Sequence, residues 1–530
     1  MHRSRHFIPG IITAGFIFVF VAASLVGLLS HSSSFNPTAL WSDTYYRHIT
    51  LFSFYQSFIS TLLSVVLAIP VAHALSRRHF FAKKMLLKLF ATTLVLPVLV
   101  GIFGLLAIYG NSGVISDIFN YFDKQLPFSI YGLNGILLAH VFFNLPFAAR
   151  LFLQSLQSIP TEHHKLSAHL GIYHWNKFKL IEWPVIRQQL PHVCGLVFML
   201  CFTSFATVMA LGGGPKSTTI ELAIYQAIKF DFDLQSGALL ALWQMFLCAG
   251  LVLYIQSFSK VIAVTSEERQ DKLPLFADSK RALLWDVSWI TLVTLFVIPP
   301  LLMVIFSGIN TQFIDVVTGW HFWSALGNSF VVATFAAFIA LAAGMLILIS
   351  SRRWRLLGLR FRADKLELIG TIILVTPGIV ISTGIFLLLR NWTNIFDLAL
   401  VIVIVVNALM ALPYVIKTLA QPMLHIAQQY NLLASSLGMS GPSRFYLIEW
   451  KAIKKPIIHA YAISFVLSIG DLSAIALFGS QDFKTLPLYL FQLLGSYQME
   501  SAAVVSLFLL IFSVGMFAMM EKLMLKNNDK

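Results

Sequence analysis

Few residues of the kinds that carry chemistry in enzymes are spaced for catalysis or metal binding in this chain. His163 and His164 are adjacent, so their side chains cannot share one face of a helix. The three cysteines, Cys194, Cys201 and Cys248, are odd in number and lack the spacing of a zinc site. No His-x-x-x-His pair, serine nucleophile elbow or carboxylate pair falls within a long apolar stretch. We therefore expect no catalytic residue, no metal site and no cofactor.

One glycine-rich segment superficially resembles a loop that binds nucleotide phosphates. It reads Gly212-Gly213-Gly214-Pro215-Lys216-Ser217. In a phosphate loop the residue before the lysine is glycine, and here it is Pro215. We expect a structural turn and no nucleotide site, so any ATP that this protein uses must be hydrolysed by a separate subunit.

Asp471 is the clearest acidic residue deep in an apolar stretch. A carboxylate in hydrocarbon is costly, so it must face protein or water. In one interpretation its role is structural, because Ser468 and Gly470 lie close by and a broken helix offers backbone N–H partners. In the other, Asp471 lies on a translocation path together with Ser473 and the region of Thr207. A carboxylate on such a path would suit a cationic solute.

Long apolar stretches must position these residues. Hydrophobic residues make up 58% of the 530 positions and charged residues 11%, whereas a soluble domain has about 25% charged residues. We therefore expect lipid to solvate the chain. A bilayer core needs roughly 20 helical residues, and suitable stretches lie near 7–29, 51–75, 86–109, 131–150, 192–212, 236–257, 285–307, 325–350, 367–389, 398–420, 457–478 and 499–520. The predicted fold class is all-α integral membrane, with about twelve transmembrane helices.

The basic residues orient these helices. If both termini are cytoplasmic, only six of the 37 Lys and Arg fall outside, namely Arg47, Lys124, Lys216, Lys229, Arg390 and Lys484. The positive-inside rule favours this topology over its opposite. The net charge of +14 is then a signal for orientation and for lipid headgroups, and we expect no nucleic acid as a partner.

An internal repeat is the most informative feature of the sequence. Positions in 146–183 recur in 413–450 with a constant offset of 267 residues: Pro146 and Pro413, Arg150 and Lys417, Gly171 and Gly438, and Leu180-Ile181-Glu182-Trp183 and Leu447-Ile448-Glu449-Trp450. Two parallel repeats are related by an axis along the membrane normal, and a translocation path would lie between them. The predicted domains are a first half over 1–257, a cytoplasmic linker over 258–284 and a second half over 285–530.

Each half carries one long segment between its fourth and fifth predicted helices, over 151–190 and 421–456. A connection needs only a few residues, whereas these segments contain helical patterns that end at Gly171 and Gly438, as at a C′ position or a point of close contact. Such short helices either lie among lipid headgroups or dock in a partner's groove. Two equivalent copies favour a two-fold partner.

The two segments resemble the cytoplasmic loop of binding-protein-dependent ABC importer permeases. The similarity rests on alanine and leucine before the glycine, at Ala168, Leu170 and Gly171 and again at Ala434, Leu437 and Gly438. The family's usual acidic residue is replaced by Lys165 and Leu432, and its downstream proline is present at Pro184 but is Lys451 in the second copy. The resemblance implies the type I importer permease architecture, two ATP-binding subunits docked on these residues, and a periplasmic substrate-binding protein.

Longer segments resemble the thiamine and thiamine pyrophosphate importer permeases of Gram-negative bacteria. They are Leu96-Pro97-Val98-Leu99-Val100, Ala139-His140-Val141-Phe142-Phe143-Asn144-Leu145-Pro146, Ser204-Phe205-Ala206-Thr207, Gly212-Gly213-Gly214-Pro215, Thr219-Ile220-Glu221-Leu222-Ala223-Ile224-Tyr225-Gln226 and Ser468-Ile469-Gly470-Asp471. The resemblance implies a non-enzymatic transport subunit of the bacterial inner membrane that carries thiamine or its phosphate esters.

Three other functions stay open at this point. Ferric-iron permeases share the fused two-half layout, so a ferric-iron or other small-solute importer is an alternative. A twelve-helix secondary transporter would need no ATPase, but Ser76 to Lys88 lacks the Gly-Asp-Arg arrangement of the major facilitator family, and intramembrane charges for a proton relay are sparse. A membrane enzyme is the weakest alternative, since no catalytic motif is present.

Overall fold

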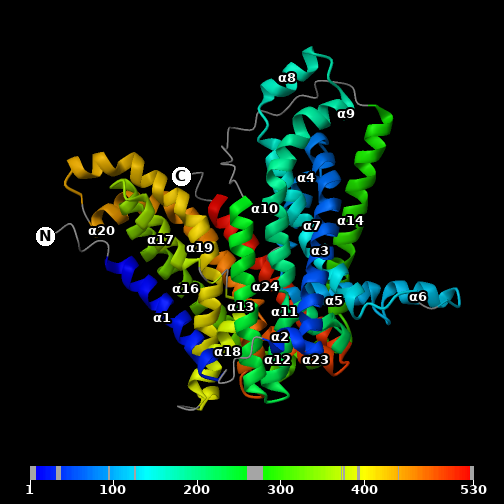
Figure 1. The fold of residues 1–530 in the computed structure, drawn as a ribbon. Coiled ribbons are helices and arrows are strands. Elements are labelled where there is room, and N and C mark those ends of the chain that lie inside the picture. Colours follow the sequence, from blue (N-terminus) through cyan, green and yellow to red (C-terminus); the bar gives the residue numbers. More distant parts are fainter. Residues whose placement is uncertain are drawn as a thin grey trace.

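The apolar stretches form helices that run alongside one another in a bundle (Figure 1). The structure is a computed structural model of the 530-residue chain. It describes all residues except 1–7, 32–37, 94–95, 125–126, 259–278, 372, 374–375, 391–393, 440 and 526–530. The described part of the chain contains helices and no strand, which confirms the all-α prediction.

The long helices correspond to the predicted spans. They are α1 (Ile8–His31), α3 (Thr44–Arg77), α7 (Leu133–Gln157), α10 (Trp183–Phe202), α13 (Leu234–Phe258), α14 (Lys280–Gly308), α16 (Trp320–Leu356), α19 (Ile395–Ser436), α21 (Trp450–Ile469) and α24 (Met499–Leu525). With a span over Val98–Tyr121, 11 helical stretches of the described residues are long and apolar enough to cross a membrane. These confirm a multi-pass membrane protein.

The ninth predicted span, 367–389, is not one continuous helix. Helix α17 (Arg360–Gly370) ends well before α18 (Gly378–Leu389) begins, and α18 has only 12 residues. Pro377, which precedes α18 with an extended backbone, supplies no N–H and disfavours helix for the residue before it. The counterpart span 86–109 is divided in the same way, between α4 (Lys83–Thr93) and α5 (Val98–Tyr109).

The shorter helices repeat in the same order in the two halves. Helices α4 and α17 have 11 residues each and α5 and α18 have 12, while α12 (Ile220–Lys229) and α23 (Leu486–Gly495) have 10. The first half also contains α2 (Ala39–Ser42), α6 (Val114–Tyr121), α8 (Thr161–His169), α9 (His174–Lys177) and α11 (Phe205–Leu211). The second half contains α15 (Phe313–Thr318), α20 (Gly441–Arg444) and α22 (Ser473–Phe478).

The first long helix of each half packs on the other half. Helix α1 contacts α16, α17 and α18, whereas α14 contacts α3 and α5, and the two lie on opposite sides of the bundle in Figure 1. Both crossings are very close, because a Cβ at Gly27 would overlap the carbonyl oxygen of Gly384 and one at Gly104 would overlap that of Pro300. The two predicted halves therefore pack into each other through their first long helices.

Different polar contacts accompany the two crossings. The carboxylate of Asp286 on α14 is fully buried and accepts from Arg78 at 2.7 Å, with Arg77 Nε at 3.7 Å. On α1, the backbone N–H of Gly10 donates to Ser350 Oγ at 3.1 Å. An ionic contact thus joins α14 to the first half, and a neutral one joins α1 to the second.

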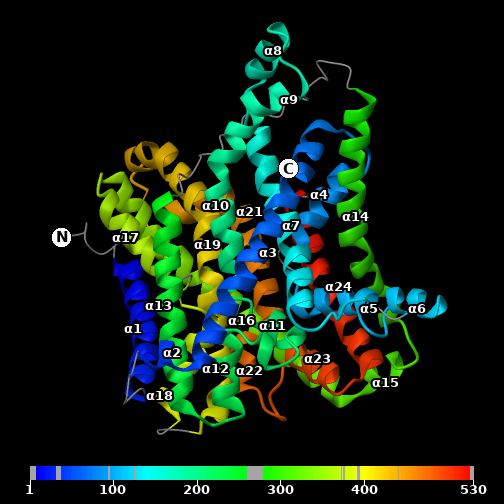
Figure 2. The same ribbon diagram turned by 45° about the vertical axis from the view of Figure 1, so that its right-hand side comes forward.

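The two predicted coupling segments lie at one end of the bundle, which we call the loop end. Helices α8 and α9 lie at the top of Figures 1 and 2, and α20 lies in the upper part of Figure 1, while α12, α18 and α23 lie at the opposite end. Most of the predicted linker 258–284 lies outside the described residues. Its last residues already belong to α14, which begins at Lys280.

Candidate functional site

The helical turns that end at Gly171 and Gly438 have the same geometry. Each glycine has a left-handed backbone, with φ of 66° and 65°. Behind them, Ile172 N–H donates to Ser167 O at 2.8 Å and Met439 N–H donates to Ala434 O at 2.9 Å. Each of these hydrogen bonds closes a loop of six residues, which is the mark of a Schellman motif. Glycine is favoured at the C′ position of this motif, because a left-handed backbone is unfavourable for a residue that carries a Cβ. A side chain would meet little here, so the turn and not crowding explains both glycines.

Apolar side chains point outward on both turns. Leu166 and its counterpart Leu433 are 58% and 52% exposed, and Leu170 and Leu437 are 64% and 63% exposed. The agreement between positions 267 residues apart shows that the exposed pair is a repeated feature. Large apolar side chains kept in the open at matching positions are typical of a surface that contacts lipid headgroups or a partner protein. We call the four leucines the docking leucines.

The alanines of the predicted motif do not occupy matching positions. With an offset of 267, Ala434 corresponds to Ser167, and both are buried beneath their turns. Ala168 is half-buried and corresponds to Ser435. The repeated requirement is therefore a small buried residue four positions before the glycine.

The predicted path residues lie where two long helices are interrupted. Helix α10 gives way to α11 after Phe202, and α21 gives way to α22 after Ile469. Thr207 is buried in α11, whereas Asp471 and Ser473 are half-buried at the start of α22. Among the described residues no hydrogen bond joins Thr207 to the other two, so the structure brings only Asp471 and Ser473 together.

The Asp471 side chain caps helix α22. Its Oδ1 accepts from Ser473 Oγ at 2.8 Å, and its Oδ2 accepts from Ala474 N–H at 3.3 Å. These bonds match the structural interpretation, since they satisfy donors at a helix N-terminus. The cap also lies between the halves: a Cβ at the neighbouring Gly470 would lie 3.0 Å from Pro97 in the first half.

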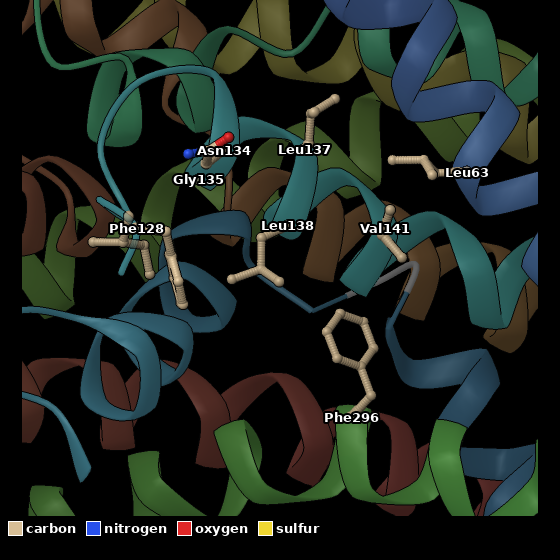
Figure 3. A pocket seen from close by; sticks show the side chains of 9 residues that line it. Leu63, Phe128, Asn134, Gly135, Leu137, Leu138, Val141 and Phe296 are labelled. Atoms are coloured by element: carbon tan, nitrogen blue, oxygen red, sulfur yellow. The ribbon is translucent and has the colours of Figure 1, made fainter. Parts of the chain in front are cut away.

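The described part of the chain has an apolar pocket of about 450 Å³ between α3, α7 and α14 (Figure 3). It is lined by Leu63, Phe128, Ile130, Asn134, Gly135, Leu137, Leu138, Val141 and Phe296. Because none of these side chains is charged, the pocket offers no ionic partner to a cationic or phosphorylated solute. We do not assign it to the substrate.

The whole chain is similar to known bacterial permeases. It is 45% identical over 517 residues to the thiamine transport system permease protein ThiP of Escherichia coli (strain K12), which covers 97% of this chain and 96% of the relative. The corresponding protein of Salmonella typhimurium is 45% identical over 520 residues, with the same coverage. That of Haemophilus influenzae is 40% identical over 523 residues, again covering 97% and 96%.

The chain belongs to the family of thiamine transport system permease proteins. Residues 358–524 also match the family described as binding-protein-dependent transport system inner membrane component. This permease is thus a multi-pass membrane subunit of an ABC transporter, as its resemblance in sequence implied.

Three glutamates of this permease had no role assigned from the sequence. Glu182 and Glu449 belong to the repeated Leu-Ile-Glu-Trp motif, and both are buried in ion pairs. Their exact recurrence in an apolar context was the available signal. Glu221, on α12, is fully buried at the far end, and burial raises its pKa to about 8. Glu221 has no acidic counterpart, because Pro487 stands at the matching position of α23.

Proposed function

We propose that this permease forms the translocation path of an ATP-driven importer for thiamine and its phosphate esters. Its partners would be two ATP-binding subunits at the loop end and a periplasmic substrate-binding protein at the opposite end of the bundle, where α12, α18 and α23 lie. The repeated Schellman turns carry this proposal, since each holds two docking leucines at the same end of the bundle. Two equivalent surfaces suit a partner with two-fold symmetry.

The substrate is proposed from the relatives. The three proteins cited above are each named as thiamine transport permeases and align over almost the entire chain. Thiamine carries a cationic thiazolium ring, and Asp471 retains exposed surface between the halves. We place Asp471, Ser473 and Thr207 along the path, with Asp471 both capping α22 and facing the cation.

The charge distribution supports a cytoplasmic loop end and two cytoplasmic termini. Replacing Asp231 or Arg353 by cysteine gives a test, because these residues fall on opposite sides in this topology. In a background without the native cysteines, an impermeant maleimide added to intact cells should label position 231 and spare position 353. Labelling of position 353 instead would reverse the orientation.

Transport by the reconstituted complex tests the proposed function. Labelled thiamine should accumulate in proteoliposomes only when the permease, its ATPase, the binding protein and ATP are all present. Uptake of ferric iron without thiamine uptake would favour the iron alternative, and uptake driven by a proton gradient without ATP would favour a secondary transporter.

Coupling is tested in the same proteoliposomes with Gly171→Asp combined with Gly438→Asp. A charge beside the docking leucines should abolish uptake and stimulated ATP hydrolysis, because the apolar contact is then disrupted on both sides. Gly358→Asp is the control. Gly358 also has a positive φ, of 79°, in open space at the end of α16, so it carries the same backbone strain outside the segments. If the binding protein still stimulates ATP hydrolysis normally in the double variant, the segments do not dock ATP-binding subunits, and the interpretation that they lie among lipid headgroups is left.

The path role of Asp471 is tested with Asp471→Asn, which keeps the cap but removes the charge. Stimulated ATP hydrolysis should persist while thiamine uptake at limiting concentration falls about tenfold, the effect of losing roughly 1.4 kcal/mol of binding. Undiminished uptake would leave Asp471 with the structural role alone.

A further inference from the structure

Two buried glutamates occupy matching positions where the coupling segments join the long helices. Glu182 precedes α10 and Glu449 precedes α21, and they are 5% and 2% exposed. A carboxylate hidden from water must be paired and hydrogen-bonded, because its desolvation is otherwise very unfavourable. The partners of these carboxylates therefore show what each junction holds together.

In the second half, Glu449 joins three elements. Its Oε2 accepts from the Arg352 guanidinium of α16 at 2.6 Å, and its Oε1 accepts from Arg444 Nε of α20 at 3.0 Å. Each carboxylate oxygen is thus held by a different arginine in a charge-assisted bond, the stronger class of hydrogen bond. The coupling segment, α21 and the long helix α16 meet at this one side chain.

In the first half, Glu182 joins the corresponding three elements. His73 Nε2 of α3 lies 2.9 Å from Oε2, and Lys177 Nζ of α9 lies 3.9 Å from Oε1. Lys177 matches Arg444 with the offset of 267, and His73 lies one helical turn before the counterpart of Arg352. The partners differ in chemistry, yet the same three-way junction is built twice.

A π-helical turn leads into each carboxylate. These turns span Phe178–Glu182 and Phe445–Glu449, and in each the first residue packs near the following tryptophan, with ring centroids 6.0 Å and 6.2 Å apart. Single π turns within α-helices are rare and are frequent at functional sites. Here the π turn connects the coupling segment to the long helix, and the buried glutamate is its last residue.

We propose that Glu182 and Glu449 are positioning residues that make each coupling segment and its two long helices move as one body. This inference rests on the proposed docking of ATP-binding subunits on the segments. The docking leucines of the second half lie at the C-terminal end of α19, which packs along both α16 and α21, and the Glu449 junction ties α20 and the π turn to the same two helices. Without the carboxylate, α20 and the π turn are no longer tied to α16, so part of the displacement is absorbed at the turn before it reaches the path.

The first test uses Glu449→Gln and Glu182→Gln in the reconstituted complex. The ratio of binding-protein-stimulated to unstimulated ATP hydrolysis should fall at least fivefold in each variant, and thiamine uptake should fall at least tenfold. Glu367→Gln is the matched control, because Glu367 pairs with Arg355 at 3.0 Å at the loop end but belongs to neither junction. Wild-type ratios in both junction variants would overturn the proposal.

A second test reads the junction in the permease alone. Spin labels at Ser443 on α20 and Phe338 on α16 should give a narrow distance distribution in the wild type and a broad one in Glu449→Gln. An unchanged distribution would overturn the proposal whatever the transported solute is. If instead the wild-type complex transports no thiamine while the junction behaves as expected, only the proposed function fails.

A covalent link covers the case in which the glutamine variants assemble poorly. In a background lacking Cys194, Cys201 and Cys248, Arg352→Cys with Glu449→Cys should be uncoupled while the thiols are free. A short bifunctional maleimide that joins them should restore the stimulated ratio at least threefold in the same preparation. Restoration supports a mechanical junction, whereas no gain after linking contradicts it.

Discussion

Helices α1 and α14 begin the two halves and make matching crossings, yet they are fixed by different interactions. Two half-buried arginines hold α14 through the buried Asp286, whereas α1 relies on backbone approach at Gly27 and on neutral hydrogen bonds, including one from Ser24 Oγ to Ile381 O at 3.2 Å. One architecture thus tolerates two solutions. In the first half, Arg77 and Arg78 point toward Asp286 of α14. The buried Glu182 of that half is therefore paired with His73, whereas Glu449 of the second half is paired with Arg352.

Asp286→Ala should have the largest effect. It leaves Arg78 without its buried carboxylate partner, a kind of change that costs about 3–5 kcal/mol. The melting temperature of the purified permease should fall sharply. Thr13→Ala, near the start of α1, is the control and should change it little, because the Thr13 hydroxyl donates within its own helix, to Pro9 O at 2.9 Å. Equal losses in the two variants would remove the contrast between the crossings.

Gly27→Ala should come next, at roughly 1–3 kcal/mol, because the added methyl overlaps backbone of α18 and the helices must separate. Gly15→Ala on the same helix meets nothing within 4 Å and should be neutral or slightly stabilising, since alanine favours helix. Thermal unfolding of both variants in one detergent gives the comparison. A tolerated Gly27→Ala would show that the close approach is not required.

Glu221→Gln should change the pH dependence of stability, at about 1.4 kcal/mol per pH unit. The pKa of Glu221 is raised in the folded state from 4.5 to about 8, so the folded protein binds more protons than the unfolded chain between these values. Glu221 therefore costs stability progressively as the pH rises from 4.5 to 8. The glutamine variant lacks this dependence, so its advantage in melting temperature should grow between pH 5.5 and 7.5.

The control for this third prediction is Glu162→Gln, at an exposed position of α8. It should leave the pH profile of the melting temperature parallel to that of the wild type. A parallel profile for Glu221→Gln as well would show that Glu221 is ionised in the folded protein.

Ser350→Ala should have the smallest effect, about 1 kcal/mol. It removes the acceptor for the Gly10 N–H, which lies in the first turn of α1 and has no acceptor within the helix. Ser350→Thr keeps an acceptor and should recover most of the loss in melting temperature. A loss as large as that of Asp286→Ala would mean that the neutral contact is as strong as the ionic one.

The membrane spans and the repeat were predictable because apolar length and recurring residues are local signals. The C′ glycines were predictable as well, since a left-handed turn after a helix favours glycine wherever it occurs. The division at Pro377 could have been read from the proline, but the apolar run around it dominated the prediction.

The packing of α1 on the second half and of α14 on the first half could not be predicted from the same signals. An apolar stretch shows that a helix enters lipid, but it does not show which distant helix it packs against, and the two crossings join residues more than 190 positions apart, as at Gly104 and Pro300. The glutamate junctions were missed for a related reason. The recurrence of Glu182 and Glu449 shows that the position is repeated in both halves, but only the packed structure shows that the two carboxylates are buried and which side chains they contact.

Because α1 and α14 each pack on the other half, they also limit the order in which the protein can fold during synthesis. Helix α1 leaves the ribosome first, but its neighbours α16, α17 and α18 are synthesised only after the whole first half has been inserted. During that interval the face of α1 that carries Ser24 and Gly27 must be tolerated by lipid or by an insertion factor. The first half likewise waits for α14 before Arg77 and Arg78 find Asp286. Neither half can mature ahead of the other, so a truncated chain would present unsatisfied surfaces that quality-control proteases can recognise.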